Sequence, residues 1–211
     1  MCAIEGTDGV MKTTDCQIFL SASFPSGERG QQVAPFDAGG IADAVTALVR
    51  AIFLSGGRLV FGGHPTITPL VLLIGVELEA AGRVDIFQSR WFEDQVTPET
   101  QRLVESGVGE LHWTDRRESL DESLHVMRDE MLMSTSPVAA VFVGGMSGIE
   151  EEFRAFGDAH PSVPRLALMG PGGAAARLPI EDVPTELRRH LSSRHYPFVA
   201  SQIVKYFTAS E

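Results

Sequence analysis

The strongest constraint on the fold of this chain is the alternation of short apolar runs with longer segments of helical periodicity. This alternation is typical of βαβ units, in which helices connect parallel strands. The expected strands are 17–21, 58–61, 84–88, 110–113, 138–143 and 165–169, and the expected helices are 38–54, 69–81, 98–105, 120–133, 148–156 and 197–207. We therefore expect an α/β fold, a single Rossmann-like domain whose mainly parallel sheet carries helices on both faces.

Length and charge narrow the class of protein. The 211 residues suit a single domain, expected over residues 15–208, with an N-terminal extension over residues 1–14. The net charge of −11 argues against a general surface for nucleic acid or membranes, because such surfaces need clustered Lys and Arg. The two cysteines predict no disulfide framework. Because residues 1–14 lack a signal-peptide pattern and the apolar runs are short, we expect a cytoplasmic protein.

Glycine pairs follow three of the expected strands, at Gly62-Gly63, Gly144-Gly145 and Gly172-Gly173. The carboxyl ends of parallel strands lie at one edge of a sheet, so these turns are expected to line a common crevice. Several such turns at one edge favour a ligand that carries phosphate. The longest irregular stretch, residues 24–37, follows the first strand and is interpreted either as a functional lid or as a partly disordered loop.

The segment 138–153 reads as a buried strand, a glycine turn and a helix whose first turn holds Glu150, Glu151 and Glu152. Free N–H groups at a helix start attract phosphate, whereas three carboxylates repel it. Ser147 and Glu150 have the spacing of a capping box, which gives Glu150 a structural explanation. Since successive helical residues are turned by about 100°, at most two of the three acids face the crevice.

The loop over residues 61–69 matches neither a P-loop nor a dinucleotide-binding pattern. In the structural interpretation, Thr68 caps a helix that has Pro69 at its first position. In the functional interpretation, Thr66, Thr68 and nearby amides donate hydrogen bonds to a phosphate. His64 either contacts a ligand or is a satisfied structural histidine.

Taken together, these residues resemble the SLOG superfamily, which includes the lonely-guy phosphoribohydrolases and the ligand-sensing domains of bacterial antiphage systems such as Thoeris effectors. The hydrolases carry P-G-G-x-G-T-x-x-E after a strand. Residues 144–152 are similar to this motif with one extra residue between the glycines, which places Gly148 at the later glycine and Glu152 at the catalytic acid. Arg128, sixteen residues before Gly144, resembles the catalytic arginine of that family.

The sequence departs from the hydrolase motif at two positions. Val143 stands in place of the proline, and Ile149 replaces the threonine and so removes a hydroxyl that could bind phosphate. These departures, together with the loop over residues 61–69, resemble the sensing branch, whose members bind ADP-ribose-derived signals. The resemblance further implies a homodimer or a higher homo-oligomer.

Two functions follow from the resemblance. In the first, the chain is a sensor of ADP-ribose, cyclic ADP-ribose or a related NAD-derived signal in bacterial defence or stress signalling, and it acts through an effector protein partner or by sequestering the signal. In the second, it is a nucleotide N-glycosidase in which Glu152 and Arg128 are catalytic. The expected ligand-binding residues are Ser21, Ser23, Gly62, Gly63, His64, Thr66, Thr68, Arg128, Gly144, Gly145, Met146, Ser147, Gly148, Glu151 and Glu152.

No metal site and no cofactor are expected. His112, His125, His160, His190 and His195 show no ligand spacing on a shared face. The two cysteines also lack the spacing of a metal site.

Overall fold

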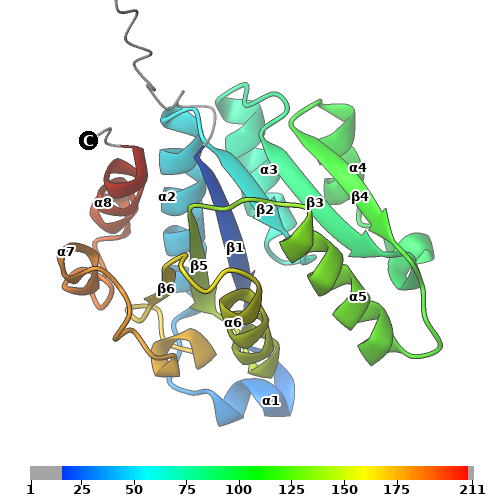
Figure 1. The fold of residues 1–211 in the computed structure, drawn as a ribbon. Coiled ribbons are helices and arrows are strands. Elements are labelled where there is room, and N and C mark those ends of the chain that lie inside the picture. The colour runs from blue at the N-terminus through cyan, green and yellow to red at the C-terminus, as the bar shows by residue number, and fades with distance from the viewer. Residues whose placement is uncertain (1–15, 209–211) are drawn as a thin grey trace, which may run out of the picture.

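A six-stranded, all-parallel sheet forms the centre of the molecule (Figure 1). The structure is a computed structural model and describes residues 16–208, so the expected extension over residues 1–14 lies outside the described residues. The strands are β1 (Gln17–Ser23), β2 (Arg58–Phe61), β3 (Val84–Ser89), β4 (Gly109–Thr114), β5 (Ala139–Gly144) and β6 (Arg165–Leu168), in the order β4-β3-β2-β1-β5-β6.

The main helices cover both faces of this sheet and confirm the expected α/β fold. They are α2 (Ala38–Leu54), α3 (Thr68–Glu77), α4 (Pro98–Glu105), α5 (Leu120–Met133), α6 (Ser147–Ala159) and α8 (Tyr196–Thr208). In Figure 1, α5 and α6 lie in front of the sheet, and α2, α3 and α4 lie behind it. None of the helices between residues 16 and 208 has the length and apolarity needed to cross a membrane.

Each face of the sheet has its own apolar core. Behind the sheet, Ile18 and Leu20 of β1 pack with apolar side chains of α2, α3 and α8. In front, Phe19 of β1 lies 5.2 Å from Phe156 of α6, measured between ring centroids. Because neighbouring residues of a strand point to opposite faces, a strand buried on both sides is rich in apolar residues. This explains why residues 18–20, 59–61 and 139–143 stand out in the sequence as apolar runs.

Side-chain caps mark the starts of three of the main helices. The Asp37 side chain accepts a hydrogen bond from the Gly40 N–H at the start of α2, and Thr97 and Ser119 cap α4 and α5 in the same way. The helix α3 ends at Glu77 instead of residue 81, because the chain turns at Glu79, whose φ of 49° is left-handed.

Four short helices were not expected from the sequence. They are α1 (Gly27–Gln32), α7 (Thr185–Arg188) and the 3-10 helices η2 (Arg90–Gln95) and η3 (Ala174–Arg177). The helix α1 corrects the interpretation of residues 24–37 as an irregular stretch. It has no side-chain cap, and Gly30 is its only buried residue, so neither capping nor apolar periodicity marks it in the sequence.

Candidate functional site

The chain reverses its direction of travel across the sheet between β1 and β5. It passes outward from β1 through β2 and β3 to β4, and then returns to place β5 on the other side of β1. In open α/β sheets, ligands bind outside the carboxyl ends of the strands at such a switch point. Ser21 and Ser23 end β1 at this point, where Ser23 is in register with Gly144 of β5. The topology therefore brings the expected β1 serines next to the glycine turn.

The backbone of the turn after β5 favours glycine. Gly144 and Gly145 have φ values of +63° and +68°, in the left-handed region. A Cβ atom on Gly145 would lie 2.1 Å from Cδ1 of Ile149, and the Gly145 N–H donates to the Ser23 carbonyl at 2.8 Å. The turn is thus held against β1 and leads directly into α6.

The start of α6 differs from the expected capping box. Met146 is the N-cap residue and makes no side-chain cap hydrogen bond, and Ser147 is already the first helical residue. The capping-box interpretation of Ser147 and Glu150 is therefore wrong. Ile149, which stands at the threonine position of the hydrolase motif, is buried under the glycine turn. A core side chain thus occupies the place at which the hydrolases offer a hydroxyl.

Glu152 and Arg128 lie together at the centre of the site. Arg128 Nε is 3.5 Å from Glu152 Oε1, and Arg128 NH1 donates to Glu151 Oε2 at 3.0 Å. The Ser21 side chain, from a residue only 3% exposed, lies beside the Glu152 carboxylate and acts to lower the pKa of that group. Among residues 16–208, Glu150 makes no ion pair, so two of the three acids of the helix contact the arginine.

The surroundings of Glu152 favour its protonated form. Burial raises the pKa of Glu152 above the ordinary value of a carboxyl group, and the Ser21 hydrogen bond and the charge of Arg128 only partly oppose this effect. The Glu152 side chain is 23% exposed and that of Arg128 is 15% exposed, so a small molecule can reach both. Arg128 Nε makes no hydrogen bond in the described residues. The site therefore holds a carboxyl group with a raised pKa beside the guanidinium of Arg128.

The loop between β2 and α3 contains the expected site residues His64 and Thr66. The Thr66 N–H and hydroxyl lie 3.3 Å and 2.9 Å from His64 Nδ1. Since the backbone N–H can only donate, Nδ1 accepts, and the neutral imidazole carries its proton on Nε2. Burial also lowers the pKa of His64, which keeps the ring neutral. His64 thus offers an Nε2–H donor to its surroundings.

The Thr68 side chain forms a hydrogen bond within this loop. It is fully buried, and its hydroxyl donates to the His64 carbonyl at 3.1 Å. Ile67, not Thr68, occupies the N-cap position of α3, so the expected cap is wrong. Of the two threonines, Thr66 is the exposed one.

Gln88 was not among the site residues expected from the sequence. It is the last residue but one of β3 and is buried, and its Nε2 donates to the Gly63 carbonyl at 3.1 Å. Gly63 has a φ of +58°, and a Cβ atom there would lie 2.9 Å from that Nε2. Gln88 therefore positions the β2–α3 loop. Only its place near the end of a strand could have pointed to it.

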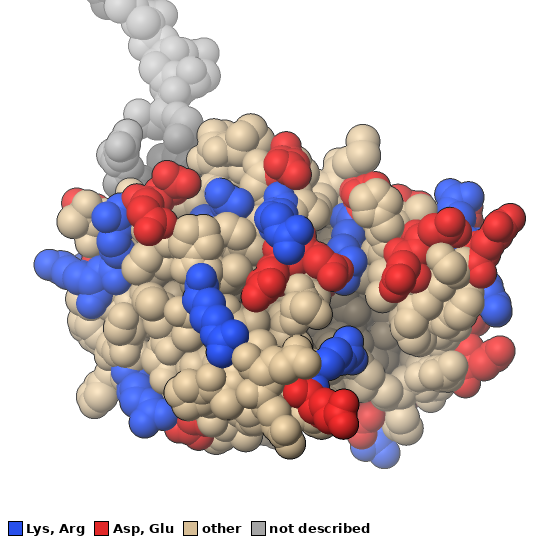
Figure 2. All heavy atoms as spheres, turned by 90° about the horizontal axis from the view of Figure 1, so that it is seen from below, with Lys and Arg blue, Asp and Glu red and all other residues tan. Residues whose placement is uncertain are grey.

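The helix α5 lies close to both the β2–α3 loop and the start of α6. A Cβ atom on Gly62 would lie 3.5 Å from Cε of Met127, and one on Gly148 would lie 3.9 Å from NH2 of Arg128. Two consecutive residues of α5 thus approach the β2–α3 loop and the start of α6. Figure 2 views this end of the molecule and shows a hollow bordered by basic and acidic side chains.

The third glycine turn, Gly172-Gly173, packs against the turn after β5. The Ala174 N–H donates to the Gly145 carbonyl at 3.1 Å, and a Cβ atom on Gly173 would lie 2.7 Å from the Gly144 carbonyl carbon. A groove of about 390 Å³ lies beyond it, between residues 33–37 and 169–173. The structure therefore places the three glycine turns at the same edge of the sheet, as expected, with two of them in direct contact.

Comparison with known proteins shows similarity to one protein family and to solved structures. The sequence model of the SLOG cluster3 family matches residues 34–196. The X-ray structure of TM1055, a structural-genomics target, superimposes with a TM-score of 0.56 at 15% sequence identity, and the alignment covers 91% of this chain and 98% of TM1055. At this identity the likeness concerns the fold. No curated protein matches the sequence.

Proposed function

The chain belongs to the SLOG cluster3 family, and we propose that it binds a nucleotide-derived small molecule at the carboxyl ends of β1, β2 and β5. The ligand class is ADP-ribose, cyclic ADP-ribose or a related NAD-derived signal. In this proposal the protein is a sensor in bacterial defence or stress signalling, and it acts through an effector protein partner.

The observation that carries the proposal is the contact of Glu152 with Ser21 and Arg128 beside the glycine turn. Amides at the start of α6 suit a phosphate, since they are not capped by a side chain. The Arg128 guanidinium, whose side chain is 15% exposed, adds a charged donor for the same group. The Glu152 or Glu151 carboxylate accepts hydrogen bonds from ribose hydroxyls. One site thus offers partners to both halves of a nucleotide.

The second candidate function is N-glycoside hydrolysis, and the environment of Glu152 favours it. Breaking the bond between ribose and base develops positive charge on the sugar, which the Glu152 carboxylate stabilises while it orients the attacking water. The raised pKa of Glu152 brings the group closer to neutral pH, where a carboxyl group exchanges protons efficiently. Arg128 holds the phosphate. Against this function stands Ile149, whose buried side chain replaces the hydroxyl of the hydrolase motif.

A single experiment separates the two functions. The purified full chain is incubated with nucleoside monophosphates, NAD, ADP-ribose and cyclic ADP-ribose, and both base release and the shift in melting temperature are measured. A sensor shows a large shift with an ADP-ribose compound and no base release. Base release that is lost in Glu152→Gln but kept in Glu150→Gln identifies the hydrolase instead. Glu150→Gln is the matched control, because Glu150 lies on the same helix turn and makes no ion pair within residues 16–208. No response to any of these compounds refutes the ligand class.

We also propose that the chain forms a homodimer through α3. Leu73 and Val76 of this helix are 61% and 52% exposed, and they line an apolar groove of about 710 Å³ between α3 and α4. Exposed apolar side chains in one groove are typical of a protein–protein interface. In sedimentation experiments, Leu73→Glu should convert the dimer to a monomer, whereas Leu54→Glu on α2 should not. A monomeric unaltered chain contradicts the proposal.

A further inference from the structure

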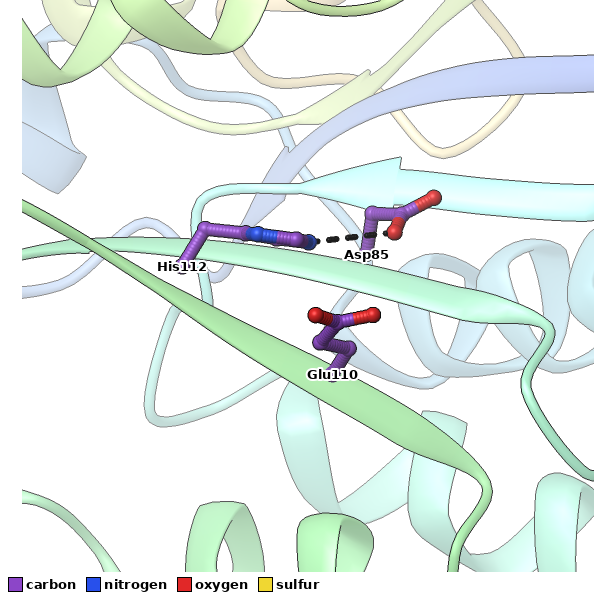
Figure 3. Close-up of side chains that lie close together, drawn as sticks. All are labelled: Asp85, Glu110 and His112. Atoms are coloured by element: carbon purple, nitrogen blue, oxygen red, sulfur yellow. Dashed lines mark hydrogen bonds and ion pairs between the residues drawn. The ribbon is translucent and has the colours of Figure 1, made fainter.

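A second cluster of ionisable side chains lies away from the crevice, toward the amino ends of the strands. Asp85 is the second residue of β3, and Glu110 and His112 lie on the neighbouring strand β4 (Figure 3). Four residues of β3 separate Asp85 from the carboxyl end of the strand, which at about 3.3 Å per residue is about 13 Å. This cluster is therefore separate from the proposed nucleotide site.

Strand register brings the three side chains together. Asp85 is in register with Glu110, and Phe87 is in register with His112. Residues two apart on a strand point to the same face, so all three side chains project from one side of the sheet. His112 Nε2 lies 3.1 Å from Asp85 Oδ1, and one potential ligand atom from each residue lies within 4.8 Å of the others.

The surroundings hold this arrangement in place. The second oxygen of Asp85, Oδ2, accepts hydrogen bonds from Arg58 at 2.9 Å and from Gln17 at 3.2 Å. Asp85 is only 8% exposed, so these bonds fix a largely buried carboxylate and leave Oδ1 facing His112. The imidazole is stacked on Phe87, with ring centroids 4.7 Å apart. Groups that orient a ligand through its other atoms are a regular feature of metal sites.

We propose that Asp85, Glu110 and His112 bind a divalent first-row transition-metal ion, with Zn²⁺ as the representative ion. One imidazole nitrogen and two carboxylate oxygens are ligands that Zn²⁺ accepts, and water completes the coordination. Mg²⁺ and Ca²⁺ prefer oxygen ligands alone, so the imidazole selects against them. The ion replaces the hydrogen bond that His112 Nε2 donates to Asp85 Oδ1, so Nε2 gives up its proton to become the metal ligand, and the bound imidazole carries its proton on Nδ1.

The charge and exposure of the site suit a metal ion that binds reversibly. Two carboxylates and the Arg58 guanidinium leave one net negative charge beside the imidazole of His112. Glu110 is exposed on β4, an edge strand, so its side chain is free to move toward the ion. A bound ion links β3 to the edge of the sheet and thereby stabilises the fold.

Titration of the full chain with Zn²⁺ tests this proposal. After treatment with a chelator, we expect one Zn²⁺ per chain by calorimetry and a higher melting temperature with Zn²⁺ but not with Mg²⁺ or Ca²⁺. Glu110→Gln and His112→Gln should each weaken Zn²⁺ binding by roughly tenfold or more. The control is His125→Gln, which alters an exposed histidine of α5 and should leave the affinity unchanged.

Two further measurements keep the test decisive. The visible spectrum of the Co²⁺ complex should report a nitrogen–oxygen site and should change in His112→Gln. Melting of the metal-free variants shows whether they fold, and Glu110→Gln alters an exposed group that the fold does not need. Absence of Zn²⁺ binding by the unaltered chain overturns the proposal, as does undiminished binding in both variants.

Discussion

Glu152 and Asp85 are both carboxylates that lie beside an arginine, yet their surroundings differ. Asp85 has three fixed partners from neighbouring strands, namely Arg58, Gln17 and His112. Glu152 has Ser21 and an arginine that it shares with Glu151, and Arg128 Nε remains without a hydrogen bond. The difference shows that neighbouring strands hold Asp85 in one position, whereas Glu152 has fewer fixed partners. Glu152 lies at the topological switch point, where nucleotide ligands are expected.

The largest expected effect tests the backbone that carries Glu152. Gly145→Ala should lower the free energy of unfolding by about 2–4 kcal/mol, because a left-handed φ and a contact of 2.1 Å with Ile149 act together. Urea denaturation measures this loss. Gly148→Ala is the control, since its Cβ atom meets nothing closer than 3.9 Å. Equal stability of the two variants would show that the turn tolerates a side chain.

The two arginines should separate binding from stability. Arg128→Met should weaken binding of ADP-ribose by about 10- to 100-fold, because a charge-assisted hydrogen bond contributes about 1.5–3 kcal/mol. Arg58→Met should leave this affinity unchanged and cost about 1–2 kcal/mol of stability. This cost is below that of breaking a fully buried ion pair, because the Arg58 side chain is 39% exposed. Calorimetry and urea denaturation measure the two effects. If both variants bind alike, the contrast between the carboxylates is wrong.

A smaller effect concerns pH. Because burial raises the pKa of Glu152 in the folded state, the folded chain holds this proton more tightly than the unfolded chain does. The resulting stability is fully present below the ordinary carboxyl pKa of 4.5 and is lost as the pH rises through the folded-state pKa. Glu152→Gln should therefore gain stability relative to the unaltered chain as the pH rises above about 4.5. Urea denaturation over a pH series measures the difference, and a constant difference refutes the raised pKa.

The smallest expected effect belongs to the exposed partner of Arg128. The Glu151 side chain is 52% exposed, so its ion pair is screened by solvent. Glu151→Gln should change the free energy of unfolding by less than about 0.5 kcal/mol. The variant leaves Glu152 as the only one of these two glutamates that pairs with Arg128. A much larger loss in urea denaturation would mean that Glu151, and not Glu152, is the main partner of the arginine.

Much of the candidate site follows from short-range patterns. The spacing of Gly144, Gly145 and Glu152 after a buried strand identified the segment, and the rule for parallel sheets placed the glycine turns at one edge. The same patterns misjudged Ser147, since a capping box assumes that the helix starts one residue later than the glycine turn allows. Thr68 is not a cap for the same reason, because Ile67 is the N-cap residue and Thr68 already belongs to the helix. Its hydroxyl donates to the His64 carbonyl instead.

The sequence alone determined the alternation of strands and helices, because burial on both faces of a sheet favours apolar runs and an amphipathic helix has its own period. It also determined that glycine forms the turn after β5. Only the tertiary structure decided which polar side chains meet. Ser21 reaches Glu152, and Asp85 reaches Arg58 and His112, through strand order and register, which join positions far apart in the chain. Sequence periodicity records which face a residue occupies, whereas its partner on that face depends on which strand lies beside it.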